Sequence, residues 1–389
     1  MRIFAFDRAA RPLVIALVAL STGTAVQAQG RLVIIGGGLS RENEAVYRSI
    51  LDARQGTGQF CIIPTAAANA AEGFASAVTS FDRHGGTGTA VPVVIDVQKP
   101  ETARDAGIVA QIERCSGFFF VGGVQSRVIN ALLPNGERTP TLDALLRRYR
   151  DGAVIAGSSA GAAIMSDPMI AGGTSAGAIA NGVRRASGDA DDDDGPGGVS
   201  ITRGIGFFPH ALVDQHFLAR GRIGRLIVAV DELTEFDLGF GIDENTALVT
   251  EGTTVWPVGA SGVVVLDARD AHKQGSTLSN LRVHLMGSGD RYDVATRTLA
   301  IDPAKTALPP STGTVNAPED VFARWQFLQL LNAFARTQQR ELTIPIEGGT
   351  VVLRKTAEFA ARSAAGTGVQ DMPAALSITG LTLQLRLDR

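Results

Sequence analysis

The sequence lacks a large excess of charge of either sign, and this absence limits the partners it can have. Its 36 lysine and arginine residues nearly balance 39 aspartate and glutamate residues, for a formal net charge of −3. Proteins that bind nucleic acid through its phosphates need a basic surface. We therefore expect no nucleic-acid partner.

Cysteine is also scarce, since the chain contains only Cys61 and Cys115. Each lies beside an apolar run typical of a buried strand, and neither has a metal-ligand spacing with the five histidines. We therefore predict no metal site, and no motif indicates a cofactor. A disulfide between them would be possible if the protein is exported to an oxidising compartment. Buried free cysteines are commoner in strands, however, so we expect free thiols.

Beyond the N-terminus, no hydrophobic run is long enough to span a bilayer. Residues 1–28 combine three arginines with the apolar run Pro12–Leu20 and end in small residues around Val26 and Ala28. This pattern predicts a signal peptide cleaved near Ala28, and hence a secreted protein, extracellular or periplasmic, that is free of the membrane after cleavage. A membrane anchor is the alternative, but the run is shorter than the ~20 residues required.

Hydrophobic residues make up 45% of the full sequence, and beyond residue 28 they have the patterning of an α/β protein. Apolar strands predicted at 31–35, 59–63, 91–95, 117–121 and 153–156 alternate with segments of helical periodicity. This alternation predicts a mainly parallel sheet with helices on both faces. From residue 253 the apolar pattern changes to period two, which predicts added antiparallel strands.

The predicted domain organisation follows from these patterns. We expect an α/β domain over 29–302 and a β-rich C-terminal extension over 303–389, beginning with a linker rich in proline, threonine and alanine. No catalytic constellation is evident in the extension.

The stretch Ala153–Met165 has the pattern of a nucleophile elbow, a strand followed by Gly-x-Ser-x-Gly and a helix. Gly157 and Gly161 flank Ser159 because a sharp turn from strand to helix leaves no room for side chains. Ser159 is therefore the candidate nucleophile. The N–H of Ala160, at the start of the helix, is a candidate oxyanion donor.

A second Gly-x-Ser-x-Gly lies at Gly173–Gly177, centred on Ser175. The segment before it is too short for a core strand and ends in glycine. The segment after it stops at Gly182 and does not continue as a helix. We therefore favour Ser159 as the nucleophile.

Two glycine-rich loops follow predicted strands and should lie at the carboxyl edge of the sheet, where active sites of such folds occur. The triplet Gly36–Gly38 is not a dinucleotide motif, because position 41 is arginine. In the second loop, Gly122–Gln125, Gly123 could supply a second oxyanion donor. The alternative is that these glycines only end the strands.

The segment Val213–Arg225 combines one histidine with a dense group of arginines. His216 lies at a predicted junction between strand and helix, and Arg220, Arg222 and Arg225 suggest a carboxylate-binding pocket, because guanidinium groups pair with carboxylates through two parallel hydrogen bonds. A solvated helix face is the alternative. Glu244, after a short apolar strand, is placed to orient an imidazole.

The aspartate-rich segment 188–198 buries nothing and is expected to be a surface loop. Alternatively, it forms an acidic flap that attracts a cationic substrate. A calcium loop is disfavoured, because the regular ligand spacing and the closing glutamate are absent.

Taken together, four motifs resemble the cyanophycinases of peptidase family S51, which are related to aspartyl dipeptidase. They are Gly122–Gln125, Gly157–Ala162, Asp214–Phe217 with the three arginines, and Gly241–Glu244. The resemblance covers about residues 31–298, and with the signal peptide it is closest to the extracellular members.

The resemblance implies a flavodoxin-like fold akin to class I glutamine amidotransferases, and a Ser-His-Glu triad formed by Ser159, His216 and Glu244. It also implies a set of substrate-binding residues: Gln125, Asp214, Gln215, Arg220, Arg222 and Arg225. The expected substrate is cyanophycin or β-Asp-Arg peptides, and the expected product is the β-Asp-Arg dipeptide. A homodimer is possible.

Two features depart from the family pattern. Val124 replaces a residue that is often polar in relatives, and the aspartate-rich insertion separates the serine from the histidine. Some members are described with the third carboxylate soon after the serine, but residues 172–187 contain no aspartate or glutamate, which favours Glu244.

Three other functions are compatible with parts of the pattern. One is that of a secreted β-aspartyl dipeptidase. An esterase of the α/β-hydrolase type also carries Gly-x-Ser-x-Gly, but its triad order along the chain is serine, acid, histidine. A secreted, inactive protein that binds acidic or Asp-Arg peptides is the non-enzymatic alternative.

Overall fold

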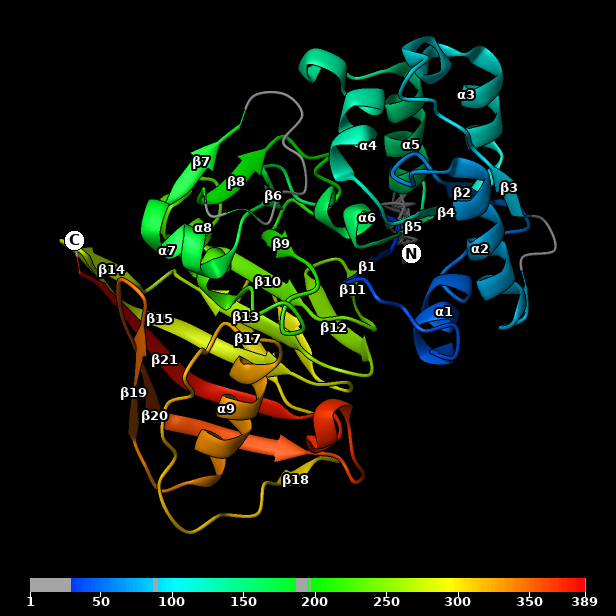
Figure 1. Cartoon of the computed structure of the whole chain (residues 1–389). Coiled ribbons are helices and arrows are strands. Elements are labelled where there is room, and N and C mark those ends of the chain that lie inside the picture. Colours follow the sequence, from blue (N-terminus) through cyan, green and yellow to red (C-terminus); the bar gives the residue numbers. More distant parts are fainter. Residues whose placement is uncertain (1–28, 87–89, 187–194, 196, 389) are drawn as a thin grey trace, which may run out of the picture.

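The computed structural model describes residues 29–86, 90–186, 195 and 197–388 (Figure 1). The predicted signal peptide and nearly all of the aspartate-rich segment lie outside these residues. Among the described residues, no helix has the length and apolar character needed to cross a bilayer. Within the same residues, no group of three or more His, Cys, Asp or Glu side chains is arranged to hold a metal ion.

The first sheet has nine strands. Five of them pair parallel with one another, and the other four continue the sheet through antiparallel pairing. In spatial order, its strands are β17 (Thr298–Ala300), β16 (Arg291–Asp293), β12 (Thr254–Gly259), β11 (Thr246–Glu251), β1 (Leu32–Ile35), β5 (Val154–Ser158), β4 (Cys115–Phe120), β2 (Gln59–Ile63) and β3 (Ala90–Pro92). The central β1 pairs parallel with β5 and antiparallel with β11. The junction between the two halves of the sheet therefore lies beside the strand that carries the elbow.

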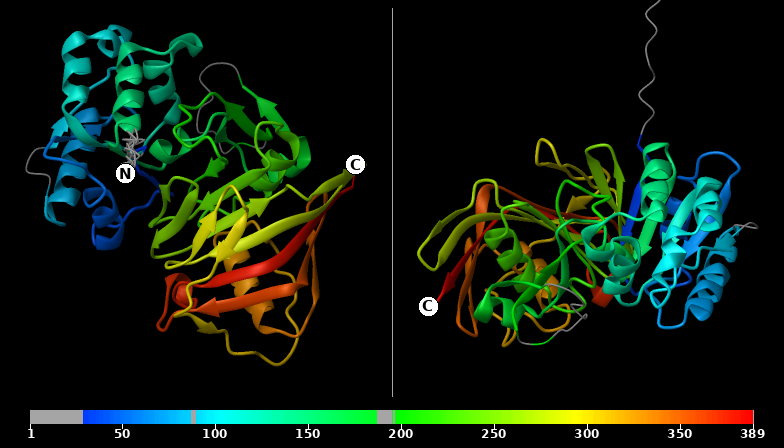
Figure 2. Two further views of the ribbon diagram at one scale, coloured as in Figure 1. Left: turned by 180° about the vertical axis from the view of Figure 1, so that it is seen from behind. Right: turned by 90° about the horizontal axis from the view of Figure 1, so that it is seen from above.

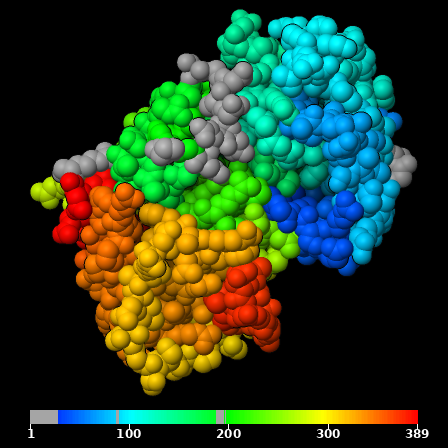
Figure 3. Space-filling model, in the orientation of Figure 1, coloured from blue at the N-terminus to red at the C-terminus, as the bar shows by residue number. Residues whose placement is uncertain are grey.

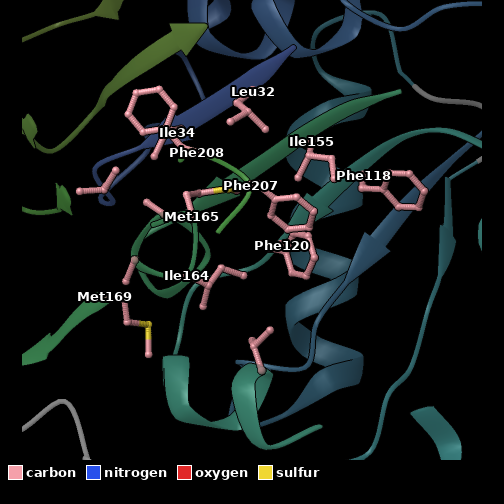
Figure 4. Close-up of a cluster of buried hydrophobic side chains, with 14 of the residues drawn as sticks. Leu32, Ile34, Phe118, Phe120, Ile155, Ile164, Met165, Met169, Phe207 and Phe208 are labelled. Carbon is pink, nitrogen blue, oxygen red and sulfur yellow. The ribbon is translucent and has the colours of Figure 1, made fainter. Parts of the chain in front are cut away.

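Helices cover both faces of the parallel half, which confirms the predicted α/β fold. They are α1 (Glu44–Leu51), α2 (Ala70–Asp82), α3 (Ala106–Glu113), α4 (Gln125–Leu132), α5 (Pro140–Arg150) and the short α6 (Ala160–Ala163). Successive residues of a strand point to opposite faces. Accordingly, Val33 packs with residues of α1 and α2, whereas Leu32 packs with residues of α3 to α5 in the core shown in Figure 4.

Helix starts follow local capping chemistry. The side chains of Asn43, Asn69, Asp105 and Thr139 accept hydrogen bonds from first-turn amides of α1, α2, α3 and α5. The cap at Asp105 separates a 3₁₀ turn, Pro100–Arg104, from α3. Two further 3₁₀ turns are Pro134–Gly136 and Val369–Asp371.

A second nine-stranded sheet is formed mainly by the C-terminal half of the chain (Figures 1 and 2). Its strands are β18 (Thr306–Ala307), β20 (Gly349–Ser363), β21 (Ser377–Leu387), β15 (Thr277–Met286), β13 (Val263–Asp267), β10 (Leu238–Ile242) and β9 (Leu212–Asp214), with β14 (His272–Gln274) beside β15 and β19 (Glu341–Ile346) beside β20. Helices α8 (Ile223–Glu232) and α9 (Gln326–Arg336) share a hydrophobic core with it. Strands β19 and β20 pair as an antiparallel hairpin.

This second sheet crosses the predicted boundary at residue 302. Strand β21 pairs with β15, and Lys305 reaches Asp290 through a buried ion pair of 2.7 Å. The C-terminal extension is therefore continuous with the sheet that carries β9 and β10.

A small third sheet, with α7 (Ser175–Asn181), was not predicted. It consists of β6 (Met169–Gly172), β8 (Val199–Thr202) and β7 (Val183–Arg185). Strand β6 is buried, but it lies outside both large sheets.

The prediction of free cysteines is wrong, because the structure joins Cys61 and Cys115 in a disulfide. The two residues lie on the adjacent parallel strands β2 and β4, with Cα atoms 5.9 Å apart. This separation is within the range that a disulfide requires. The pairing depends on strand order, which the local sequence around each cysteine does not reveal.

Candidate active site

Ser159 lies at the turn between β5 and α6, with φ 56° and ψ −111°. A Cβ atom at Gly157 would lie 2.3 Å from the carbonyl oxygen of Gly161, and one at Gly161 would lie 2.6 Å from that of Phe120. Any side chain at either position would clash with backbone, so the two glycines permit the turn. The structure therefore forms the predicted elbow.

His216 lies in the loop between β9 and α8, and its ring approaches the serine. Its Nε2 atom is 2.9 Å from Ser159 Oγ, and its Nδ1 atom is 2.7 Å from Glu244 Oε1. Glu244 follows β10 at the same edge of the molecule. The structure thus brings all three candidate residues into one hydrogen-bonded chain.

The end of β1 holds the three loops together, a role that the sequence analysis missed. The carbonyl of Ile35 accepts from the N–H of Ser159 at 3.0 Å, that of Gly36 from His216 at 2.6 Å, and that of Gly37 from Asn245 at 2.8 Å. Three consecutive carbonyls therefore fix the backbone at Ser159, at His216 and beside Glu244. The glycine triplet after the first strand was the available signal.

The same triplet leaves space for the reacting groups. A Cβ at Gly37 would lie 2.2 Å from Cε1 of His216, and one at Gly38 would lie 3.2 Å from the Glu244 side chain. The ring of His216 therefore packs directly on the Gly37 backbone, which limits its orientation.

The electrostatic surroundings favour a neutral imidazole. Burial lowers the pKa of His216, and the charges of Arg220 and Arg222 lower it further, whereas the hydrogen bond and charge of Glu244 raise it. The net effect is a pKa of His216 below the ordinary value of 6.5. A neutral imidazole hydrogen-bonded to a serine hydroxyl can accept its proton, as general base catalysis requires.

Both candidate oxyanion donors lie close to Ser159. Ala160 occupies the first turn of α6, where N–H groups have no intrahelical acceptor. On the other side, a Cβ at Gly122 would lie 3.9 Å from Ser159 Oγ, so the Gly122–Gly123 backbone passes beside the hydroxyl. Gly123 has φ 145°, and a Cβ there would lie 2.0 Å from the carbonyl oxygen of Ala66, which restricts the position to glycine.

The three predicted arginines occupy different environments. Arg220 is exposed, whereas Arg222 and Arg225 are 2% and 1% exposed. Arg222 donates to the carbonyl of Gln215 at 2.8 Å. Arg225 forms two parallel hydrogen bonds with Asp214, of 2.8 and 2.5 Å, and a third to the carbonyl of Gly173.

The burial of Arg225 and Asp214 differs from the expected carboxylate-binding pocket. Each satisfies the charge of the other in the interior, which supports a structural role for this pair. The predicted contact Gln125 is also buried, and its amide donates to the carbonyl of Ala171 at 2.5 Å. Gln215 is buried too, although its Oε1 has no hydrogen-bond partner within the described part of the chain.

Ser175, at the centre of the second Gly-x-Ser-x-Gly, is buried and structural. Its hydroxyl donates to the carbonyl of Gly221 at 2.6 Å and accepts from the N–H of Gly224 at 2.9 Å. It therefore joins α7 to the loop before α8.

A cavity of about 500 Å³ opens beside the elbow. Ser158, Gly122 and Gly123 form its wall next to the nucleophile. Its remaining walls include polar side chains from α1 and α2 and the residue before α2, and the sequence analysis named none of them: Tyr47, Asn69, Glu72 and Ser76. Glu72 is the one carboxylate in the described lining of this cavity.

Comparison with known proteins places the chain in a family. The profile of peptidase family S51 matches residues 32–257, more than half of the chain. The cyanophycinase of Nostoc sp. (strain PCC 7120 / SAG 25.82 / UTEX 2576) is 34% identical over 217 residues, which cover 53% of this chain and 66% of the Nostoc protein. The cyanophycinase of Synechococcus elongatus is 33% identical over 219 residues, covering 54% and 61%.

The chain thus spans slightly less than two thirds of the length of these curated relatives. Among solved structures, a peptidase from an acI-B1 Actinobacterium superposes with a TM-score of 0.44 at 20% identity, covering 61% of this chain and 91% of that one. Because the profile extends over more than half of the sequence, the chain belongs to peptidase family S51.

Proposed function

We propose that the protein is a serine-type peptidase that cleaves the backbone peptide bonds between the β-Asp-Arg units of cyanophycin. The main observation behind this proposal is that Ser159, His216 and Glu244 are joined by hydrogen bonds beside an open cavity. Membership of family S51 and relatives named cyanophycinase support it.

The proposed reaction is acyl transfer through a covalent intermediate. His216 Nε2 takes the proton of Ser159 as Oγ attacks the backbone carbonyl, and Glu244 stabilises the resulting imidazolium through Nδ1. The N–H groups of Gly123 and Ala160 hold the oxyanion. The imidazolium then protonates the leaving amine, and water, deprotonated by His216, releases the acid product.

Charge complementarity supports the proposed substrate. Cyanophycin carries an arginine on each aspartate side chain, so every unit presents a guanidinium and a free carboxylate. Glu72 in the cavity is a suitable partner for the guanidinium, and the exposed Arg220 for the carboxylate. The expected product is β-Asp-Arg dipeptide.

Export remains part of the proposal. The Cys61–Cys115 disulfide agrees with the oxidising compartment that the predicted signal peptide implies.

The decisive experiment incubates the purified protein and Ser159→Ala with insoluble cyanophycin and identifies soluble products by mass. We expect the wild-type protein to release β-Asp-Arg and the variant to lose hydrolysis by about 10⁴-fold or more. Glu244→Gln should keep the fold but lower kcat by about 10³- to 10⁴-fold, since the amide no longer stabilises the imidazolium.

Ser175→Ala is the matched control, because it alters the other Gly-x-Ser-x-Gly and should retain hydrolysis. Undiminished hydrolysis by Ser159→Ala would contradict the mechanism. Activity on short p-nitrophenyl esters without release of dipeptide would favour an esterase, and binding without turnover would favour a peptide-binding protein.

A further inference from the structure

The segment Val321–Trp325, just before α9, packs on the loop that carries His216. The N–H of Trp325 donates to the carbonyl of Leu218 at 2.8 Å. A Cβ at Gly221 would lie 1.7 Å from the carbonyl oxygen of Phe322. Figure 3 shows the orange C-terminal region in contact with the green centre of the chain on this face. The family profile ends at residue 257, so this contact comes from outside the matched region.

Trp325 also connects the histidine loop to the residue before Glu244. Its indole N–H donates to Asp243 Oδ2 at 3.1 Å, and the other oxygen of Asp243 accepts from the N–H of Ala219 at 2.8 Å. Asp243 is fully buried and accepts a further bond from Ser261. The indole therefore completes a buried junction between the loops of His216 and Glu244.

Arg324 lies at the outer side of the triad carboxylate. Its guanidinium carbon is 4.2 Å from the centre of the Trp325 ring, and Nη2 is 3.6 Å from Glu244 Oε2. The other carboxylate oxygen, Oε1, contacts the imidazole. Stacking on the indole thus places a cation on the oxygen of Glu244 that faces away from His216.

We propose that Val321–Trp325 is a positioning element of the active site, in which Arg324 orients Glu244 and Trp325 fixes the junction at Asp243. The proposal rests on the proposed function only for the identity of the reaction. Arg324 acts through Glu244 and His216, so it is a positioning residue. The C-terminal extension thereby contributes to a site whose candidate reacting groups all precede it.

The charge of Arg324 should be detectable at the imidazole. Among the described residues, the other charged groups around His216 are Glu244, Arg220 and Arg222, with Asp243 beside Glu244. Arg324 partly neutralises Glu244 and repels the imidazolium, so both effects disfavour protonation of His216. Removal of Arg324 should therefore raise the pKa of His216.

The test titrates the five histidines by NMR in the wild-type protein, Arg324→Gln and Arg324→Lys, with His216 assigned by its absence from His216→Asn. We expect Arg324→Gln to raise the pKa of His216 by about 0.2–0.5 unit at low salt, and less at high salt, because Arg324 is 64% exposed. Arg324→Lys should restore a value near that of the wild-type protein. Arg386→Gln, an exposed arginine of β21, is the matched control and should leave it unchanged.

Cyanophycin kinetics give the second readout. Arg324→Gln should lower kcat by about 3- to 10-fold with little change in KM, and Trp325→Phe, which removes the indole donor but keeps an aromatic ring, should lower kcat as well. An unchanged His216 pKa in Arg324→Gln, or an equal shift in Arg386→Gln, would overturn the proposal. Absence of hydrolysis by the wild-type protein would instead contradict the proposed function, and the titration would still decide the role of Arg324.

Discussion

Ser159 and His216 both have positive φ angles, 56° and 48°. Residues other than glycine rarely adopt this region of backbone conformation. Each conformation costs on the order of 1–3 kcal/mol and persists only where surrounding contacts impose it. Here the carbonyls of Ile35 and Gly36 bind the two N–H groups. The strain at the candidate reacting residues is thus offset by hydrogen bonds from one strand end.

At this scale we predict the acid limb of the pH profile. The proposed mechanism requires neutral His216, so kcat/KM should rise as this residue loses its proton. Because burial and the neighbouring arginines lower its pKa, the midpoint should lie below 6.5. Steady-state rates between pH 4 and 8, with circular dichroism to verify folding at each pH, would check this. A midpoint above 6.5 would contradict it.

At the scale of elements, the end of β1 determines whether the loops after β5, β9 and β10 meet. The three strands belong to two different sheets. The consecutive carbonyls of residues 35–37 bridge these sheets by binding one loop each. A small change at Gly37 should therefore affect catalysis more than folding.

We predict that Gly37→Ala lowers kcat by about 10²-fold, because the added methyl group would displace the imidazole and small misplacements of reacting groups have effects of this size. Gly56→Ala is the matched control: Gly56 also has positive φ, 77°, but nothing lies within 4 Å of the added Cβ. Both variants should lose similar stability in thermal melts, and only Gly37→Ala should lose activity. Equal activity in the two would show that the ring tolerates displacement.

At the scale of the whole molecule, buried polar contacts join the C-terminal extension to the rest of the fold. Lys305 binds Asp290 and Ser377, and Ser377 also donates to Asp290. Lys305 and Asp290 are 2% and 0% exposed at their side chains. The extension should therefore unfold together with the sheet it completes.

We predict that Lys305→Met lowers the free energy of unfolding by about 3–5 kcal/mol, because it leaves the Asp290 carboxylate buried without a cation. Lys273→Met, which breaks a partly exposed pair with Asp231, should cost at most about 1 kcal/mol. Urea unfolding measures both. A loss below 1 kcal/mol for Lys305→Met would show that the extension contributes little to global stability.

The order of the parallel-half elements and the candidate triad could be predicted from sequence because their signals are local. Apolar runs predict buried strands, and the glycines around Ser159 reflect the sterics of one turn. Glu244 was found from its place after a short apolar strand, and the role of His216 came from a resemblance whose motifs are also short. Helix boundaries were less certain, as the cap at Asp105 shows, because a single side chain decides them.

The sequence by itself therefore determined the fold class, the elbow and the candidates for the reacting groups. Only the tertiary structure decided that Cys61 meets Cys115, that Arg225 is bound to Asp214 in the interior, and that Arg324 reaches Glu244. Each of these contacts joins separate elements, and the last crosses from the C-terminal extension to the candidate active site. Local periodicity and turn sterics do not predict such pairings, because the pairings depend on how two sheets and their loops pack against each other.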